Sequence, residues 1–161
     1  MVYHSLCKPD IAMPASATEV NGITDALLAD APSFAQIWPD LVPTPAPLYA
    51  WNADFDREVL LRTAKRFDLA VPEALKDTKR WNCAMKLHAR WYGEWSNGRN
   101  AYRWQPLAWA CVDLEIEENE QQHRALGDTQ TTLRVLRALA GRANSAHPLP
   151  TEMPSHARYS G

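Results

Sequence analysis

Two short candidate strands, each followed directly by a helical pattern, constrain the fold of this chain most strongly. Residues 48–51 form a run too short for a helix, after a stiff proline-rich connector, and predict a buried strand. Residues 80–83 predict a second strand, and residues 84–91 the helix after it. Strands that alternate with helices predict an α/β layered domain. The helix after the first strand is marked by apolar residues at helical spacing: Phe55, Val59, Leu60, Ala64 and Phe67.

The remaining chain predicts one more strand and several helices. Residues 2–7 are typical of a short strand, and Thr24 and Ser33 are predicted to cap two short helices. Residues 106–114 predict a short helix with a proline near its first turn. The last helix is predicted over residues 126–140, with a buried stripe of four leucines, Leu126, Leu133, Leu136 and Leu139.

The domain organisation follows from length and composition. With 161 residues, 46% of them hydrophobic, the chain is long enough for one domain with a core. We expect one domain at residues 1–143 and a flexible tail at residues 144–161, which contain three prolines and little apolar content. No stretch approaches the roughly 20 apolar residues that a membrane span requires, so no membrane association is expected.

The first residues and the cysteines suggest a compartment. The opening residues lack a basic segment followed by an apolar one, so no secretion signal can be read there. The chain has three widely spaced cysteines, Cys7, Cys83 and Cys111. This number and spacing argue against a disulfide framework and against a structural zinc site. A reducing cytoplasm is therefore the expected location.

The net charge of −2 hides a basic middle region. Residues 57–103 contain eleven basic and five acidic residues, a net charge of +6, and an acidic run follows at residues 113–120. Six tryptophan and tyrosine residues lie within or just after the basic region: Trp81, Trp91, Tyr92, Trp95, Tyr102 and Trp104. Such a region is able to hold a phosphate backbone and stack bases. A solvated helix face with aromatic core residues is the alternative interpretation.

Two places put carboxylates where a binding site is expected. Asp56 follows a predicted buried strand and lies in the first turn of a helix, where ligands of open α/β sheets bind and the helix dipole favours an anion. His123 and Asp128 flank the start of the last helix, and they converge only if His123 lies in the entering loop. Taken singly, a helix cap explains Asp56, and a surface histidine explains His123.

Together these motifs resemble the DEDDh 3′–5′ exonucleases, the relatives of the proofreading epsilon subunit of bacterial DNA polymerase III and of ribonuclease T. The resemblance rests on Asn52, Phe55 and Asp56 after a strand, and on His123 and Asp128 at the last helix. Further matching stretches are residues 6–9, 20–25, 31–34 and 102–107. Residues 3–140 follow the family in order.

The resemblance implies an RNase H-like fold, catalysis by two Mg²⁺ or Mn²⁺ ions, and hydrolysis of terminal phosphodiester bonds of DNA or RNA. By motif, Asp56 and Asp128 match metal ligands, and His123 matches the general base that takes a proton from water. Phe55 is expected to be a packing anchor beneath the site. The positions expected to contact the single-stranded 3′ end are Asn52, Phe55, Arg124 and Arg103.

One part of the family pattern is missing. The family's first motif, Asp-x-Glu, lies on the first strand of its sheet, and this sequence matches only from the region after the first two strands. Asp113 and Glu115 spell Asp-x-Glu, but they fall late, within a run interpreted as solvated. With Asp56 and Asp128 alone, metal affinity is expected to drop severely, because hard divalent cations need several oxygen ligands.

Three interpretations remain open. The first is an exonuclease whose coding sequence begins upstream of Met1, impaired as the 161-residue chain. The second is a degenerate relative that binds nucleic-acid ends without cutting. The third is an interaction module whose sheet edge pairs with a strand from a polymerase, another protein or a second copy of the chain.

Overall fold

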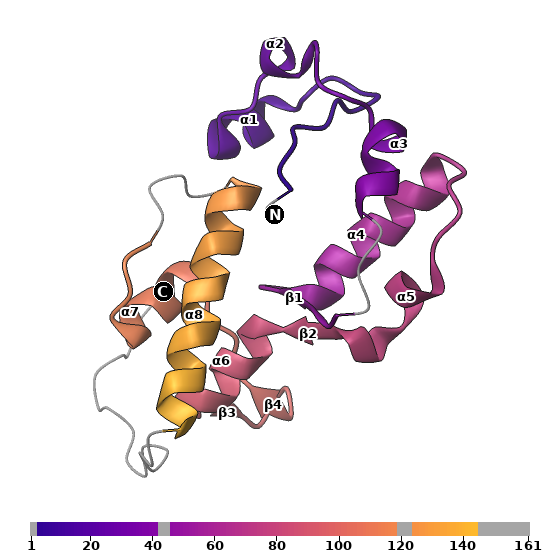
Figure 1. Cartoon of the computed structure of the whole chain (residues 1–161). Coiled ribbons are helices and arrows are strands. Elements are labelled where there is room, and N and C mark those ends of the chain that lie inside the picture. The colour runs from indigo at the N-terminus through magenta and orange to yellow at the C-terminus, as the bar shows by residue number, and fades with distance from the viewer. Residues whose placement is uncertain (1–2, 42–45, 119–123, 145–161) are drawn as a thin grey trace.

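The computed structural model describes residues 3–41, 46–118 and 124–144, in which helices surround two small pairs of strands. Figure 1 shows the short N-terminal helices at one end of the molecule and the long C-terminal helix along one side. The N-terminal part contains α1 (Ala15–Asn21), α2 (Asp25–Leu28), α3 (Phe34–Ile37) and the 3₁₀ turn η1 (Trp38–Leu41). The middle contains β1 (Leu48–Ala50), α4 (Ala53–Arg66), α5 (Glu73–Lys76), η2 (Thr78–Arg80), β2 (Trp81–Cys83) and α6 (Ala84–Tyr92). The last part contains β3 (Trp95–Ser96), β4 (Ala101–Tyr102), α7 (Leu107–Leu114) and α8 (Ala125–Asn144).

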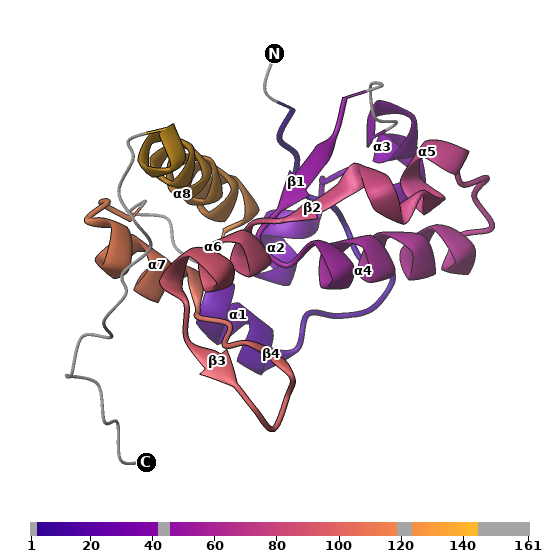
Figure 2. The same ribbon diagram turned by 90° about the horizontal axis from the view of Figure 1, so that it is seen from below.

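The two predicted central strands form a parallel pair. β1 and β2 pair in the register Leu48 with Trp81, Tyr49 with Asn82, and Ala50 with Cys83. The chain returns from β1 to β2 through α4, which packs against both strands, as Figure 2 shows. Parallel strands need such a crossover. The mixed α/β content predicted from the sequence is therefore confirmed.

Two hydrophobic clusters hold the described elements together. One joins α7 and α8 through Ala110, Cys111, Leu114 and Val135, all buried. The other joins η1, α4 and α5 through Trp38, Ala64 and Leu75, and Leu48 and Trp81 of the strands pack against it. The ends of β1 and β2 are thereby fixed between two cores.

The predicted caps of the short helices are confirmed. The Thr24 hydroxyl accepts a hydrogen bond from the Leu27 N–H at 3.3 Å. Ser33 and Gln36 form a reciprocal capping box at the start of α3, where the Ser33 N–H donates to the Gln36 carboxamide at 2.8 Å. These bonds satisfy N–H groups that have no partner within the helix.

Two sequence predictions are wrong. Tyr3 and the residues up to Cys7 form no strand, and the nearest pairing is an isolated parallel bridge between Lys8 and Ser33. The stripe of four leucines is not the buried face of α8, because Leu133 is 46% exposed while Val135 is fully buried. The side of α8 that packs on α6 and α7 is lined by smaller residues. Among the described helices, none is long and apolar enough to span a membrane.

Candidate active site

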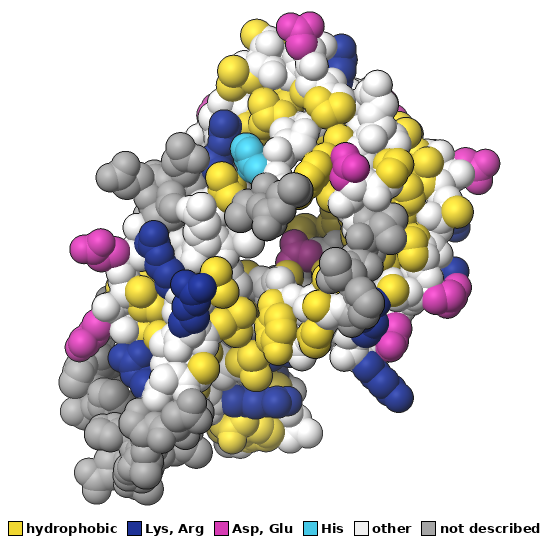
Figure 3. Space-filling model, in the orientation of Figure 1, with side chains coloured by type: hydrophobic (Ala, Val, Ile, Leu, Met, Phe, Trp, Pro, Cys, Tyr) yellow, Lys and Arg dark blue, Asp and Glu magenta, His cyan; other side chains and the backbone are white. Residues whose placement is uncertain are grey.

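Asp56 and Asp128, far apart in the chain, line the same cleft. The cleft has a volume of about 910 Å³ and is bounded by the end of β1, the start of α4, the start of α7 and one side of α8. Asn52 lines it beside Asp56, and Trp51 forms part of its wall. Figure 3 shows a hollow near the middle of this face, with an acidic side chain inside it. The structure therefore brings together two of the carboxylates singled out in the sequence.

The start of α4 positions Asp56. β1 ends at Ala50, Asn52 is the N-cap of α4, and the Asp56 N–H donates to the Asn52 carbonyl at 3.0 Å. The carboxylate thus lies in the first helical turn, where the helix dipole favours negative charge. Partial burial nevertheless raises the pKa of the Asp56 carboxyl above its usual value, and a backbone hydrogen bond from Asn52 acts in the opposite direction. A cation in the cleft would relieve the cost of burying this charge.

The start of α8 positions Asp128. Its N–H donates to the Arg124 carbonyl at 2.9 Å, and the Thr132 hydroxyl donates to the Asp128 carbonyl at 2.7 Å. The Arg124 guanidinium in turn donates to the Asn21 carbonyl at 3.0 Å, so it ties the start of α8 to the end of α1. Asp128 is therefore held in the first turn of a helix whose N-terminus is anchored to another part of the fold.

The other predicted site residues lie in different surroundings. His123 lies outside the described residues. Phe55 is 61% exposed, so the expectation of a packing anchor is wrong, and the ring is accessible to a ligand. Arg103 is exposed near the end of β4 and forms an ion pair with Glu94, with 3.2 Å between Nε and Oε1. Arg124 makes the structural contact with Asn21, and its role toward nucleic acid stays a prediction.

Sequence reasoning missed a buried pair behind the cleft. His88 of α6 is fully buried among the rings of Trp51, Trp91 and Tyr92. Its Nε2 lies 3.3 Å from a carboxylate oxygen of Asp113, whose side chain is only 19% exposed. Asp113 was interpreted as part of a solvated run, which is wrong for this residue. Burial lowers the pKa of His88 to about 4 and raises that of Asp113, because desolvation disfavours the charged form of both groups.

The described residues fit a divalent-ion site in part. Asp56, Asp128 and also Glu118 line the cleft, and carboxylate oxygens are the ligands that Mg²⁺ and Mn²⁺ prefer. Within residues 3–41, 46–118 and 124–144, however, no three such side chains are close enough together to hold an ion. Asp56 and Asp128 therefore supply a fragment of a ligand set.

Comparison with known proteins identifies the family of this chain. The family model described as Exonuclease (RNase T) matches residues 1–136, and the chain belongs to this family. It is 33% identical, over 148 residues, to the uncharacterized exonuclease CP81 of Escherichia phage 186, covering 87% of this chain and 73% of that protein. It is 32% identical, over 168 residues, to a DNA polymerase III subunit epsilon-like protein of Rhodobacter capsulatus. That match covers 98% of this chain but only 22% of the relative.

Family membership supports a nuclease function. The relatives named exonuclease and epsilon-like are those expected for a DEDDh-type exonuclease, so the resemblance found in the sequence is confirmed. Exonucleases of this kind generally use divalent metal ions, which agrees with the carboxylates of the cleft.

Proposed function

We propose that the chain is the core of a 3′–5′ exonuclease that removes nucleotides from single-stranded DNA or RNA. The observation that carries this proposal is the meeting of Asp56 and Asp128 in one cleft. These are the two carboxylates that the family motifs single out within the described residues. They lie on α4 and α8, two helices that are far apart in the sequence.

In the proposed reaction, water attacks the terminal phosphate of the strand. The bond from phosphorus to the 3′ oxygen of the preceding nucleotide breaks, which releases a nucleoside 5′-monophosphate and leaves a shortened strand. A divalent ion held by the carboxylates would neutralise the charge that develops on the phosphate. Asp56 and Asp128 would hold this ion, and His123 would accept the proton of the attacking water, since an imidazole titrates near neutrality.

The incomplete ligand set suggests where further carboxylates enter. β1 pairs with β2 on one edge, and no backbone hydrogen bond is recorded on its other edge among the described residues. The side of α8 that faces the cleft shows Leu133 and Leu136, and Tyr49 of β1 is 54% exposed there. An additional strand paired with β1 would cover these apolar groups and place its own side chains beside Asp56 and Asp128. We therefore propose that a strand carrying Asp-x-Glu completes the site.

A non-cutting module is the second candidate function. The partial ligand set and the unpaired edge of β1 also suit a protein that binds nucleic-acid ends or recruits a partner strand. The epsilon-like relative makes a polymerase one candidate partner, and a second copy of the chain is another. Whether it binds a nucleic-acid end or a partner's β-strand, such a module would not cleave nucleic acid.

Cleavage of end-labelled strands distinguishes these functions. We expect the chain extended by an Asp-x-Glu strand to release mononucleotides from the 3′ end in Mg²⁺ or Mn²⁺, and to stop when a chelator is added. Asp128→Asn and His123→Ala should abolish this release, whereas Glu19→Gln, a change at an exposed position of α1, should not. Full activity of both site variants, or internal cuts in place of 3′ trimming, would refute the proposal.

A further inference from the structure

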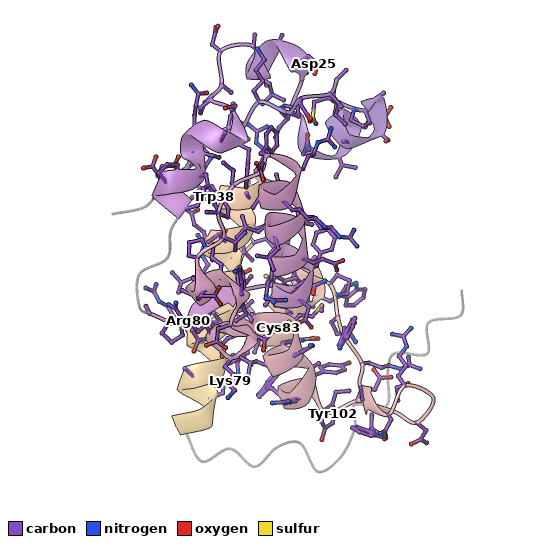
Figure 4. All side chains as sticks on the ribbon, turned by 90° about the vertical axis from the view of Figure 1, so that its right-hand side faces the viewer. Asp25, Trp38, Lys79, Arg80, Cys83 and Tyr102 are labelled. Atoms are coloured by element: carbon purple, nitrogen blue, oxygen red, sulfur yellow. The ribbon has the colours of Figure 1, made fainter. Side chains whose placement is uncertain are left out.

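A second groove lies beside the β3–β4 hairpin, apart from the cleft of Asp56 and Asp128. Its volume is about 310 Å³. Two cations of α6, Lys86 and Arg90, form one side of it, and three rings, Trp95, Tyr102 and Trp104, form the other. Figure 4 shows Tyr102 on this hairpin, at the opposite end of the molecule from Asp25. The groove falls within the basic and aromatic region noticed in the sequence.

The three rings are exposed although they are large. Trp95 is 48% exposed, Tyr102 37% and Trp104 52%. Trp95 and Tyr102 face each other across the antiparallel pair, with ring centroids 5.1 Å apart at an angle of 85°. This contact fixes their orientation before any ligand arrives. A cluster of exposed aromatic rings on one hairpin is typical of a binding surface, because single exposed rings are common but gathered ones are not.

The charged groups around the rings favour an anionic ligand. Lys86 forms an ion pair with Asp54, and Arg103 with Glu94. No ion pair is recorded for Arg90 among the described residues, and Arg99 lies exposed in the turn of the hairpin. Lys86 and Arg103 therefore neutralise Asp54 and Glu94, the two acids near the groove. Arg90 and Arg99 supply the net positive charge around it.

We propose that this groove binds single-stranded nucleic acid. Bases would stack on Trp95, Tyr102 and Trp104, and Arg90 and Lys86 would contact the phosphates, which is how sequence-tolerant strand binding is usually built. An acidic peptide would use the cations but would leave the rings without flat partners. The combination of rings and cations in one groove therefore favours a nucleic-acid strand.

The position of the groove relates it to the cleft. Lys86 contacts Asp54, and Asp54 lies in the same first turn of α4 as Asp56. A strand whose 3′ end enters the cleft would pass this turn, and the groove would hold its upstream nucleotides. This relation rests on the proposed exonuclease function, but binding in the groove does not, since it needs neither the carboxylates of the cleft nor a divalent ion.

The test measures binding of fluorescent single-stranded oligo-dT by anisotropy, in chelator, so that no cleavage occurs. Trp104→Ala is expected to weaken binding about fivefold or more, the effect of losing one stacked base. Trp109→Ala, which removes a ring of similar exposure (44%) outside the groove, is the matched control and should leave affinity unchanged. Arg90→Gln should weaken binding and reduce its salt dependence, whereas Arg62→Gln on the exposed face of α4 should not.

The outcomes separate this proposal from the exonuclease proposal. Unchanged affinity in both Trp104→Ala and Arg90→Gln would overturn the groove, and so would equal binding of a polyglutamate peptide. Trp104→Phe, which keeps a flat ring at this position, is tested beside Trp104→Ala and Arg90→Gln, and retained binding in Trp104→Phe supports stacking. Glu19→Gln, a change at an exposed position of α1 outside the cleft and the groove, should bind as well as the original chain. If the groove binds the oligonucleotide but the chain extended by an Asp-x-Glu strand releases no mononucleotides in Mg²⁺ or Mn²⁺, the exonuclease proposal is refuted and the groove proposal stands.

Discussion

Replacing His88 by methionine should stabilise the protein. His88 is fully buried, and although its Nε2 lies 3.3 Å from an Asp113 carboxylate oxygen, neither of its ring nitrogens makes a hydrogen bond of good geometry with a described residue. An unsatisfied buried polar group costs about 1–3 kcal/mol. Methionine has a similar volume and no polar nitrogen, so it should remove this cost while it keeps contact with Trp51 and Trp91. We expect His88→Met to raise the free energy of unfolding at pH 7 by about 1–2 kcal/mol.

The effect should grow as the pH falls. Burial lowers the pKa of His88 from 6.5 to about 4, so between these values the unfolded chain binds the proton that the folded chain does not. Above pH 6.5, protonation of His88 in the unfolded chain does not reduce the free energy of unfolding. As the pH falls from 6.5 toward 4, this protonation lowers the free energy of unfolding by about 3 kcal/mol in total. Asp113 has the opposite dependence, since its pKa is raised, but it is present in both proteins and cancels in the comparison.

Urea unfolding at pH 7 and pH 4 measures this difference. The advantage of His88→Met over the original chain should be larger at pH 4 than at pH 7 by about 3 kcal/mol. His4→Met, which replaces an exposed histidine, should give the same stability as the original chain at both values. A variant that is less stable at both pH values, with an unchanged pH profile, would refute the account of His88 as an uncompensated buried base.

Two further predictions concern the cleft and a helix cap. Since burial raises the pKa of Asp56, its ionised form costs stability above that pKa, and Asp56→Asn should raise the melting temperature at pH 7 without divalent ions. The difference should vanish below pH 3.8, and an increase that persists there would contradict it. Ser33→Ala should lower the free energy of unfolding by about 1 kcal/mol in urea, because it removes the capping box of α3. Ser16→Ala on exposed α1 is the control, and equal effects of both changes would count against the cap.

Local sequence patterns predicted most helices and the central strands. β1 follows from a short apolar run and β2 from the candidate strand at residues 80–83, and the ends of α6 and α8 fall within a few residues of their predicted positions. The predicted strand before Lys8 does not form, because this segment is held by one bridge and pairs with no strand in the described residues. Leu133 was misplaced for a related reason: the sequence shows which residues of α8 are apolar, but not that α6 and α7 cover only one side of the helix.

The sequence predicted only those residues of the candidate site that belong to recognisable motifs. Asp56 and Asp128 were found through family resemblance, and their common cleft could not be inferred from spacing because it depends on how α4 and α8 pack. The pair of His88 and Asp113 gives no local signal, since 25 residues separate them and only the packing of α6 beside α7 brings them together. The aromatic groove could be predicted only in part from the sequence. The composition indicated rings and cations in this region, but their convergence beside one hairpin depends on the tertiary structure.

The most direct test of the central claim is a double-mutant cycle for Mn²⁺ binding. Calorimetry on chelator-treated protein compares the chain extended by an Asp-x-Glu strand with its Asp56→Asn, Asp128→Asn and double variants. If both carboxylates hold one ion, each single change should weaken Mn²⁺ binding at least tenfold, and the double variant should lose little more than either single one. Unchanged affinity in the single variants, or losses that multiply independently in the double variant, would show that Asp56 and Asp128 do not share an ion.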